Sequence, residues 1–395
     1  MISNRIKNLA PSATLAMSQK SAELKAAGID VINMSVGEPD FDTPDFIKEA
    51  AKKAIDDNFS RYSPVPGYLP LREAICHKLK RDNNLDFTPD QIVVGNGAKQ
   101  ELTNTILSLV NPGDEVIIPT PAWVSYVEMV KLAEGKSVLI PAGIDHDFKI
   151  TPEQLKAAIS PKTRMLLLNS PCNPTGSVYS KDELRGLAEV LKDYPEIIVL
   201  SDEIYEHINF IGEVYSIATF DWMKPRTVIV NGVSKAYAMT GWRLGFMAAP
   251  VEVAKASTKL QGQYTSGPSS IAQKAAEAAY NGPQDCVEDM RKAFERRRDL
   301  IVNLAKEIPG WKVNIPQGAF YLFPDVSAYI GKKYGDKEIK SSCDYVMYLL
   351  QEAHVACVDG DSFCAPGYMR LSYATSDDNI REAMRRIREA SLPLK

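Results

Sequence analysis

Asn231-Gly-Val-Ser234-Lys235-Ala-Tyr-Ala-Met-Thr-Gly-Trp-Arg243-Leu-Gly245 places a lysine and an arginine between two apolar runs, residues 227–230 and 244–249. Both runs predict buried strands. A lysine that forms imines must lose its proton well below its usual pKa of about 10.4. Burial and a nearby cation such as Arg243 lower that pKa, and Ser234 with Arg243 suits a phosphate group. Taken alone, the stretch also fits a solvated surface lysine between two strands.

The composition excludes several classes of function. The chain has 395 residues, of which 45% are hydrophobic and 24% charged, as in ordinary soluble globular proteins. The formal net charge of -4 gives no basic surface for nucleic acid. No apolar run approaches the roughly 18 residues that a membrane span needs. We therefore expect neither nucleic acid nor a membrane as a partner.

The cysteines and histidines argue against disulfides and metals. The six cysteines show no C-x-x-C spacing, and the four histidines show no H-E-x-x-H spacing. Residues 1–10 lack the continuous apolar core of a secretion signal. We therefore expect reduced thiols, no catalytic metal and a cytoplasmic location.

A strand–turn–helix pattern begins near residue 90. Residues 91–94 predict a strand, Gly95-Asn-Gly97-Ala98-Lys99 a tight turn, and residues 99–110 a helix. A Gly-rich turn that opens a helix presents free N–H groups and a partial positive charge, which suits a phosphate. The turn lacks the spacing of a P-loop and of a dinucleotide-binding loop. By itself it does not identify the ligand.

Several polar and aromatic residues follow strand-like runs in this alternating β/α region. Because ligands bind at the carboxyl ends of strands in open parallel sheets, we expect these side chains to converge. They are Gly97, Trp123, Asn173, Asp202, Tyr205 and Lys235. A phosphate grip, an indole, a carboxylate, a phenol and an amine fit a pyridine ring with an aldehyde and a phosphate, which is pyridoxal 5′-phosphate (PLP). Individually, Trp123 also fits a core residue and Asp202 a helix cap.

The pattern changes after about residue 280. Expected elements are helices over 285–306, 341–353 and 379–390 and strands over 311–314, 319–323 and 355–358. Together they indicate a second, smaller α+β unit. We expect an N-terminal arm with part of the small domain over residues 1–45, a large PLP-binding domain over 46–284 and a small C-terminal domain over 285–395.

Three further residues are candidates for ligand contacts. Arg370 lies in an apolar, strand-like run, where it suits a substrate carboxylate or, alternatively, an ion pair. Gly37 lies in a Pro/Gly-rich loop that lets backbone approach a ligand, although a plain turn fits equally well. Tyr62 lies in another such loop and offers a phenol, or is a surface aromatic without a role.

Five motifs that contain these residues occur in a recognisable order. They are Gly37-Glu-Pro-Asp-Phe, Pro-Cys-Asn173-Pro-Thr-Gly, Ser-Asp202-Glu-Ile-Tyr205, Val-Ser234-Lys235 with Thr-Gly-Trp-Arg243, and Met-Arg370-Leu-Ser-Tyr-Ala. As a set that covers nearly the whole chain, they resemble the class I, fold-type-I PLP-dependent aminotransferases, most closely the bacterial-type aspartate aminotransferases. The resemblance implies an α/β fold, in which a large domain has a mainly parallel seven-stranded sheet sandwiched by helices. A smaller α+β domain completes it.

The resemblance also implies catalytic roles. Lys235 would carry the internal aldimine with PLP and then move the proton between Cα and C4′. Asp202 would pair with the ring nitrogen and keep it protonated. Tyr205 and Asn173 would hydrogen-bond the phenolic oxygen of the ring, and Trp123 would stack on the ring.

A phosphate site and a substrate site are implied in the same way. The phosphate contacts would come from Gly97, Ala98, Lys99, Ser234 and Arg243, and from Tyr62 of the neighbouring subunit in a homodimer. Arg370 would clamp the substrate α-carboxylate with help from Asn173. Gly37 would close over the substrate beside Trp123.

Lys99 bears on the choice of substrate. In the aspartate-specific branch that the chain resembles, a lysine at this position meets the distal carboxylate of aspartate or 2-oxoglutarate. A solvated lysine is the alternative, but a cation in the first turn of a helix is unfavourable, which favours a functional role. We therefore expect ping-pong transamination, in which L-aspartate and 2-oxoglutarate give oxaloacetate and L-glutamate.

Three alternatives remain open. Two are an aminotransferase for aromatic or other amino acids and a PLP lyase on the same fold. The third is prephenate transamination, against which Ala10 argues, because relatives with that activity usually carry a basic residue before Pro-Ser-Ala-Thr14. Cys172 and Asp359 also depart from the commoner asparagine and proline of the family.

Overall fold

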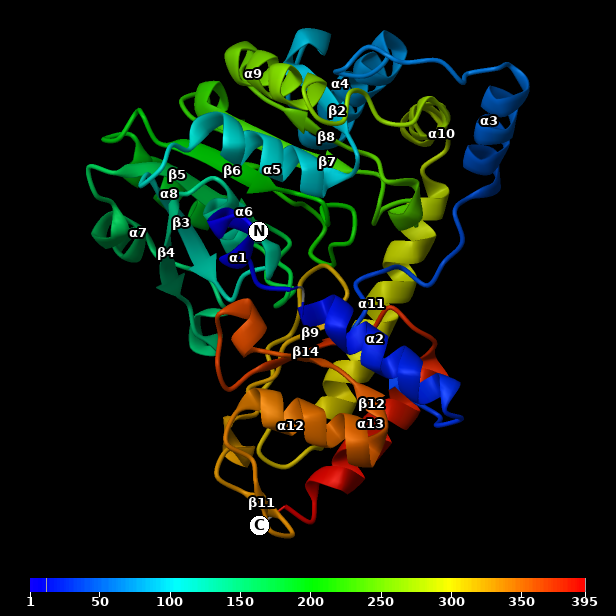
Figure 1. The fold of residues 1–395 in the computed structure, drawn as a ribbon, viewed down its shortest axis with the longest axis vertical. Coiled ribbons are helices and arrows are strands. Elements are labelled where there is room, and N and C mark those ends of the chain that lie inside the picture. The colour runs from blue at the N-terminus through cyan, green and yellow to red at the C-terminus, as the bar shows by residue number, and fades with distance from the viewer. Residues whose placement is uncertain (12, 395) are drawn as a thin grey trace.

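A seven-stranded sheet forms the centre of the structure, a computed structural model that describes residues 1–11 and 13–394 (Figure 1). In spatial order the strands are β2 (Ile92–Gly95), β8 (Gly245–Ala248), β7 (Thr227–Gly232), β6 (Ile198–Asp202), β5 (Thr163–Asn169), β3 (Glu115–Thr120) and β4 (Lys136–Pro141). Only β8 runs antiparallel to its neighbours β2 and β7 within this sheet. The prediction of a mainly parallel seven-stranded sheet is therefore confirmed.

Helices cover both faces of this sheet. One face packs against α5 (Ala98–Leu109), α6 (Ser125–Leu132) and α9 (Val251–Gly262). The other packs against α3 (Asp45–Asp56), α4 (Leu69–Asn83), α7 (Pro152–Ala158), α8 (Lys181–Leu191) and α10 (Ser270–Asn281). Because both faces are covered, central strands such as β5 and β7 are almost continuously apolar instead of alternating.

The C-terminal part builds a second apolar core together with the N-terminal segment. It comprises α2 (Ala13–Ala26), α11 (Asp285–Ala305), α12 (Ser342–Tyr348) and α13 (Asp377–Ser391). Strand β1 (Ile32–Asn33) pairs in parallel with β12 (Val355–Ala356), while β13 (Val358–Asp359), β14 (Met369–Ser372) and β9 (Tyr321–Leu322) form an antiparallel sheet. In Figure 1 the blue helix α2 lies beside this orange and red part, so an N-terminal helix packs with the C-terminal part of the chain.

The remaining elements are short. They are α1 (Asn4–Lys7), the hairpin of β10 (Lys333–Tyr334) and β11 (Lys337–Glu338), a π-helical turn (Leu349–Ala353), and 3-10 turns at Pro89–Gln91, Ile144–His146, Ile217–Thr219, Lys224–Arg226, Thr240–Trp242, Ser327–Tyr329 and Asp361–Phe363. None of the helices over residues 1–11 and 13–394 is long and apolar enough to cross a membrane.

The expected strand over residues 311–314 is wrong. Lys312 makes only an isolated bridge with Asp325, and the Asn314 side chain donates to Asp147 at 2.9 Å. Pro316 follows closely and cannot donate to a strand ladder. The expected strand over 319–323 shortens to Tyr321–Leu322.

Candidate active site

A cavity of about 470 Å³ lies where β5, β6 and β7 end. The sequence-predicted residues that line it are Gly37, Ala98, Lys99, Trp123, Asn173, Asp202, Tyr205, Ser234, Lys235, Arg243 and Arg370. They come from both ends of the chain and from the middle, so the fold brings together what the sequence separates. Open parallel sheets place ligand sites at this edge.

Lys235 follows the end of β7 and points at the backbone of the N-terminal segment. Its Nζ donates a hydrogen bond to the Gly37 carbonyl oxygen at 2.6 Å. Burial lowers the pKa of Lys235 to about 8, and the positive charge of Arg370 acts in the same direction while Glu38 opposes it. A useful fraction of this amine is therefore unprotonated near neutral pH.

Asp202 is the last residue of β6 and is buried. Its Oδ2 accepts a hydrogen bond from the Tyr126 hydroxyl at 2.7 Å, and its Oδ1 accepts one from the Ile204 N–H at 3.2 Å. Burial raises the pKa of Asp202 to about 6, although these hydrogen bonds and the charge of Lys235 lower it. The carboxylate is thus poised to pair with a cationic partner in the cavity.

Tyr205 and Tyr321 share a hydrogen bond at the side of the cavity. Their hydroxyl oxygens are 2.8 Å apart, and both side chains are buried. Burial raises the pKa of both phenols, so each stays protonated and can donate. A side chain on Gly37 would place its Cβ 2.5 Å from the Tyr321 hydroxyl, so a glycine is required for this close approach.

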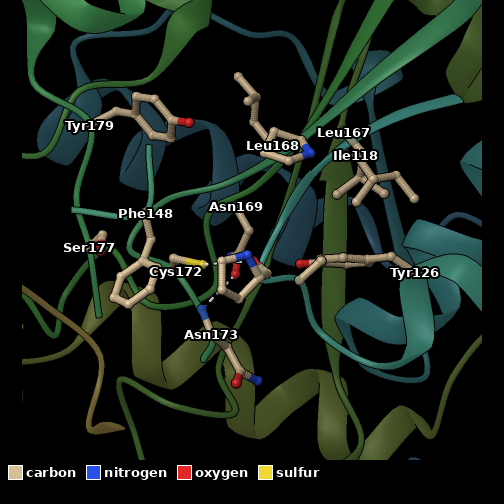
Figure 2. Close-up of a pocket in the computed structure, with 13 residues that line it drawn as sticks. Ile118, Tyr126, Phe148, Leu167, Leu168, Asn169, Cys172, Asn173, Ser177 and Tyr179 are labelled. Atoms are coloured by element: carbon tan, nitrogen blue, oxygen red, sulfur yellow. Dashed lines mark hydrogen bonds between the residues drawn. The ribbon is translucent and has the colours of Figure 1, made fainter. Parts of the chain in front are cut away.

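Asn173 lies in the loop after β5 and is held by another asparagine. Its N–H donates to Oδ1 of Asn169 at 2.8 Å, and the Asn169 amide donates to the Asp202 carbonyl at 2.9 Å. Figure 2 shows the Asn173 side chain pointing away from Cys172 and the small cavity beside it. Its Oδ1 accepts instead from Nη1 of Arg370 at 2.9 Å.

Arg370 lies in β14 and is 1% exposed. Its Nη2 donates to the Ser35 carbonyl at 2.6 Å, and its guanidinium lies 4.5 Å from the centre of the Tyr321 ring. Its buried Nε has no hydrogen-bond partner among the residues described. Because a buried donor without a partner is costly, this guanidinium suits an anionic ligand in the cavity.

The N-terminus of α5 forms an anion cradle. Gly97 has a φ of 85°, and the N–H groups of Ala98 and Lys99 take no part in the hydrogen bonds of the described chain. A Cβ on Gly97 would lie 2.6 Å from Nη2 of Arg243, and one on Gly245 would lie 2.3 Å from the Ala98 nitrogen. The two glycines therefore let the arginine and a neighbouring strand approach the helix terminus closely.

Lys99 extends from this helix terminus over an aromatic ring. Its Nζ lies 4.8 Å from the centre of the Trp123 ring. Partial burial and the charge of Arg243 lower the pKa of Lys99. A bound anion would offset both effects, because it favours the charged form of the lysine.

Tyr62 does not reach the cavity of its own chain. Its side chain is 98% exposed, and it is not among the lining residues. An exposed phenol in a loop contributes to this site only if another copy of the chain presents it.

The lining residues that sequence reasoning missed include Tyr126, Asn169 and Tyr321. Asn169 could have been found, because it is a polar residue at the end of a predicted strand. Tyr321 lies in an apolar run and has the sequence signature of a core residue. Nothing local indicates that Tyr126 points at Asp202.

The donor set fits PLP. The free amides of α5, Ser234 and Arg243 supply donors for a phosphate, and Asp202 supplies a carboxylate for a ring nitrogen. Lys235, with its pKa lowered to about 8, supplies the amine for an aldehyde.

Comparisons with known proteins agree with this geometry. Residues 29–387 match the family model "Aminotransferase class I and II". The chain is 48% identical to an aspartate/prephenate aminotransferase of Nitrosomonas europaea and 47% identical to an aspartate aminotransferase of Bacillus sp., in both cases over 98% of each chain. A crystal structure of the aspartate aminotransferase of Rhizobium meliloti superposes with a TM-score of 0.97 at 44% identity, over 100% of both chains. The chain therefore belongs to the class I and II aminotransferases and uses PLP as its cofactor.

Proposed function

We propose that this aminotransferase acts on L-aspartate and 2-oxoglutarate and releases oxaloacetate and L-glutamate. The observation that carries the proposal is the pair of cationic side chains, Arg370 and Lys99, that line one cavity. A dicarboxylic substrate carries two anionic ends, and each needs a cationic partner when it leaves water. The names of the relatives, which include aspartate, point to the same substrate class.

PLP supplies, when bound, an aldehyde for the amino group and a ring that withdraws electrons from the substrate α-carbon. Asp202 keeps the ring nitrogen protonated, and Tyr126 supports the charged state of Asp202 through its 2.7 Å hydrogen bond. Tyr205 and Asn173 donate to the phenolic oxygen. Ser234 and Arg243 bind the phosphate together with the amides at the start of α5.

Lys235 is the residue that moves the proton. With a pKa lowered to about 8, its amine would remove the proton from the substrate α-carbon and deliver the same proton to C4′ of the cofactor. Arg370 holds the α-carboxylate so that the reacting bond stays near Lys235. Gly37, whose carbonyl accepts from Lys235 at 2.6 Å, closes the cavity and excludes water.

We also propose a homodimer in which Tyr62 reaches the phosphate of the neighbouring subunit. The 98% exposure of Tyr62 in one chain supports this role.

We propose that residues 46–284 form the PLP-binding domain, with residues 1–45 and 285–395 as arm and small domain. The shared core of α2, α11 and α13 supports this division. The cytoplasm is the proposed location, and the six cysteines, which are all free thiols in the described chain, suit a reducing compartment.

Prephenate is a second candidate substrate. The name of the Nitrosomonas europaea relative includes prephenate, at 48% identity. Ala10 stands where a basic residue would be expected for that activity, and its N–H donates to Glu128 at 2.9 Å. The two candidates therefore differ in whether this position must supply a cation.

A half-reaction titration tests the proposal. The loaded enzyme is mixed with one amino acid at a time, and the visible absorbance of the cofactor is followed. Aspartate and glutamate should discharge the absorbance far faster than phenylalanine, tyrosine or alanine, and prephenate should recharge the discharged enzyme only if the second candidate is correct. Faster discharge by aromatic amino acids would contradict the aspartate assignment, and no discharge would contradict the enzyme assignment.

A further inference from the structure

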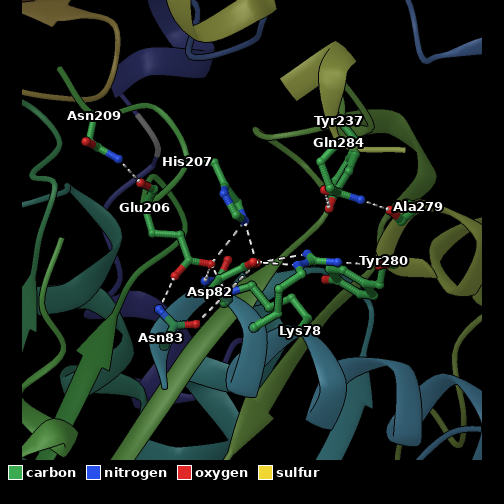
Figure 3. Close-up of polar contacts among 12 residues, drawn as sticks. Lys78, Asp82, Asn83, Glu206, His207, Asn209, Tyr237, Ala279, Tyr280 and Gln284 are labelled. Carbon is green, nitrogen blue, oxygen red and sulfur yellow. Dashed lines mark hydrogen bonds and ion pairs between the residues drawn. The ribbon is translucent and has the colours of Figure 1, made fainter. Parts of the chain in front are cut away.

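A buried polar cluster lies next to the active site but does not line its cavity. Its members are Lys78 of α4, Asn83 at the end of α4, Glu206 in the turn after β6 and Asn231 of β7. Figure 3 shows how Lys78, Asn83 and Glu206 meet. Lys78 is 1% exposed and Glu206 is 6% exposed, so two opposite charges are held almost without water.

Glu206 is the centre of the cluster. Its Oε1 accepts from Nζ of Lys78 and, at 2.7 Å, from Nδ2 of Asn231. Its Oε2 accepts from Nδ2 of Asn83 at 2.7 Å, and Asn83 in turn accepts from Lys78 at 2.8 Å. The Asn231 amide is fixed in this orientation because its Oδ1 accepts from the Gly232 N–H at 2.7 Å. Each of these polar groups is therefore bonded in one definite arrangement.

The other ionisable groups around Glu206 leave its charge in place. His207 Nε2 lies 3.4 Å from Glu206 Oε1, and Asp82, which binds Arg81, lies 3.8 Å from Lys78 Nζ. Burial by itself raises the pKa of Glu206, but the charge of Lys78, together with smaller effects of His207 and of the hydrogen bonds from Lys78 and Asn83, outweighs it and brings this pKa to about 2.

Two neighbours of this pair are neutral or partly neutral. Burial lowers the pKa of His207 and so favours its neutral form, against the charges of Glu206 and Asp82. Burial also raises the pKa of Glu203, on the same turn, to about 7. The charged unit is thus the pair of Glu206 and Lys78.

The position of Glu206 in the chain gives the cluster its significance. Glu206 directly follows Tyr205, and the last register pair between β6 and β7 is Asp202 with Val230. Asn231 is the next residue of β7, and Lys235 follows it by four positions. The hydrogen bond between Glu206 and Asn231 therefore ties the two segments together beyond the end of the ladder, just before they present Tyr205 and Lys235 to the cavity.

We propose that Lys78, Glu206 and Asn231 form a positioning network that fixes the Tyr205 hydroxyl relative to the Lys235 amine. The proposal rests on the proposed function, in which Tyr205 donates to the phenolic oxygen of PLP and Lys235 binds its aldehyde. A buried ion pair is a weak source of stability, because the loss of hydration offsets the attraction between the charges. Fixing one geometry at the cavity is a role that an apolar replacement of the same size cannot fill.

The network makes a prediction about the cofactor's spectrum. A donor on the phenolic oxygen makes that oxygen a poorer acceptor for the proton on the Lys235 nitrogen. If Tyr205 loses its position, the proton is held more tightly and the pH midpoint of the visible absorbance rises. Glu206→Gln removes the charge and turns one oxygen into a donor that faces the Asn83 amide.

The experiment compares loaded Glu206→Gln and wild-type enzyme by absorbance at increasing pH and by the rate at which PLP leaves. We expect the midpoint to rise by about half a pH unit or more and PLP to leave several-fold faster. Lys78→Met, which removes the cation, should shift the midpoint in the same direction. If Lys78→Met does not fold, the result for Glu206→Gln alone tests the positioning network, because Glu206→Gln keeps the size of the side chain and most hydrogen-bond acceptors of the site.

Arg226→Met is the matched control. Arg226 is also a buried cation, at the opposite end of β7, where it donates to the Leu191 and Tyr194 carbonyls at 2.7 and 2.6 Å. It should lower the melting temperature without moving the midpoint. If Glu206→Gln lowers the melting temperature as Arg226→Met does and leaves the midpoint unchanged, the network is only structural and the proposal is overturned. Failure of the proposed role of Lys235 is distinguishable from this outcome, because it would leave even the wild-type enzyme without a titrating absorbance.

Discussion

The Tyr126 hydroxyl lies 2.7 Å from Oδ2 of Asp202 and donates a hydrogen bond to it within a buried site. Burial raises the pKa of Asp202 to about 6, and this bond works against that rise. Trp123 packs edge-on against Tyr126, with 5.3 Å between ring centres, and keeps the phenol in place. Tyr126 thereby helps Asp202 to remain charged at neutral pH.

Tyr126→Phe should therefore raise the pKa of Asp202. A hydrogen bond to a charged group contributes about 1.5–3 kcal/mol, which corresponds to a rise of about 1–2 pH units. We expect the acid limb of the pH profile of kcat/KM to move upward, so that activity falls off at a higher pH in the variant than in the wild type. Tyr179→Phe is the control, because the Tyr179 hydroxyl accepts from the Ile150 N–H at 2.9 Å. An unchanged acid limb in Tyr126→Phe would contradict the role of Tyr126.

The lowered pKa of Lys235 predicts how the apoenzyme captures PLP. Only the unprotonated amine attacks an aldehyde, and burial brings the pKa of Lys235 to about 8. The rate of covalent capture should rise by about tenfold per pH unit below pH 8 and level off above it. Stopped-flow absorbance measures this rate. Lys235→Ala should stay folded, show no covalent capture and lose turnover by several orders of magnitude; a rate that keeps rising to about pH 10 would contradict the lowered pKa.

The sequence predicted the sheet and most of the cavity for a physical reason. Buried parallel strands read as apolar runs, and the residues just past them, such as Asp202 and Lys235, must face the same edge. Periodicity also located α5 and the glycine turn before it. These features depend on local patterns of residues, which can be recognised in a single sequence.

Features that depend on tertiary contacts could not be predicted. The hydrogen bond from Tyr126 to Asp202 joins residues 76 positions apart in the sequence, and the one between Tyr205 and Tyr321 joins residues 116 positions apart. The alternating apolar and polar residues at 311–314 look like a strand, but Asn314 bonds to Asp147 and the segment lacks a strand partner within the described chain. Tyr62 could be assigned a ligand only through the family resemblance, because it is exposed and does not line the cavity of its own chain.

Lys99→Met should reduce activity toward dicarboxylic substrates selectively. Loss of a charged hydrogen bond to a carboxylate, at about 1.5–3 kcal/mol, corresponds to a fall of roughly 10- to 150-fold in kcat/KM for aspartate. Alanine, which has no distal carboxylate, should be used as well as before or better. Lys192→Met is the matched control, because Lys192 also lies over a tryptophan, with Nζ 4.0 Å from the Trp222 ring. Equal losses for aspartate and alanine would contradict a distal-carboxylate role.

Tyr62→Phe tests the contribution of a second subunit. If the phenol donates to the phosphate of the neighbouring site, its loss should weaken PLP binding by roughly tenfold or more, from one charge-assisted hydrogen bond. Equilibrium dialysis of PLP measures the change, and sedimentation should show a dimer for both proteins. Tyr334→Phe, on the β10–β11 hairpin, should bind PLP like the wild type. A monomer with normal PLP affinity would rule out the shared site.

Glu101 predicts a pH dependence of stability that is separate from catalysis. Its side chain on α5 is fully buried, its Oε2 has no hydrogen-bond partner among the residues described, and burial raises its pKa from 4.5 to about 8. In the unfolded chain this carboxyl ionises near 4.5, whereas in the folded chain it stays protonated up to about 8. The group therefore favours the folded state fully below 4.5, and this contribution is lost as pH rises to about 8.

Glu101→Gln should abolish that loss. The stability of the variant relative to the wild type should increase with pH by up to about 1.4 kcal/mol per unit between about pH 5 and pH 8, as measured by urea unfolding. Glu382→Gln is the control, because Arg385 and Arg386 hold the pKa of this exposed carboxyl at about 2, so its relative stability should not vary over the same range. If the difference in unfolding free energy between Glu101→Gln and the wild type is also independent of pH, Glu101 is ionised in the folded protein. Burial then raises the pKa of Glu101 less than the structure implies.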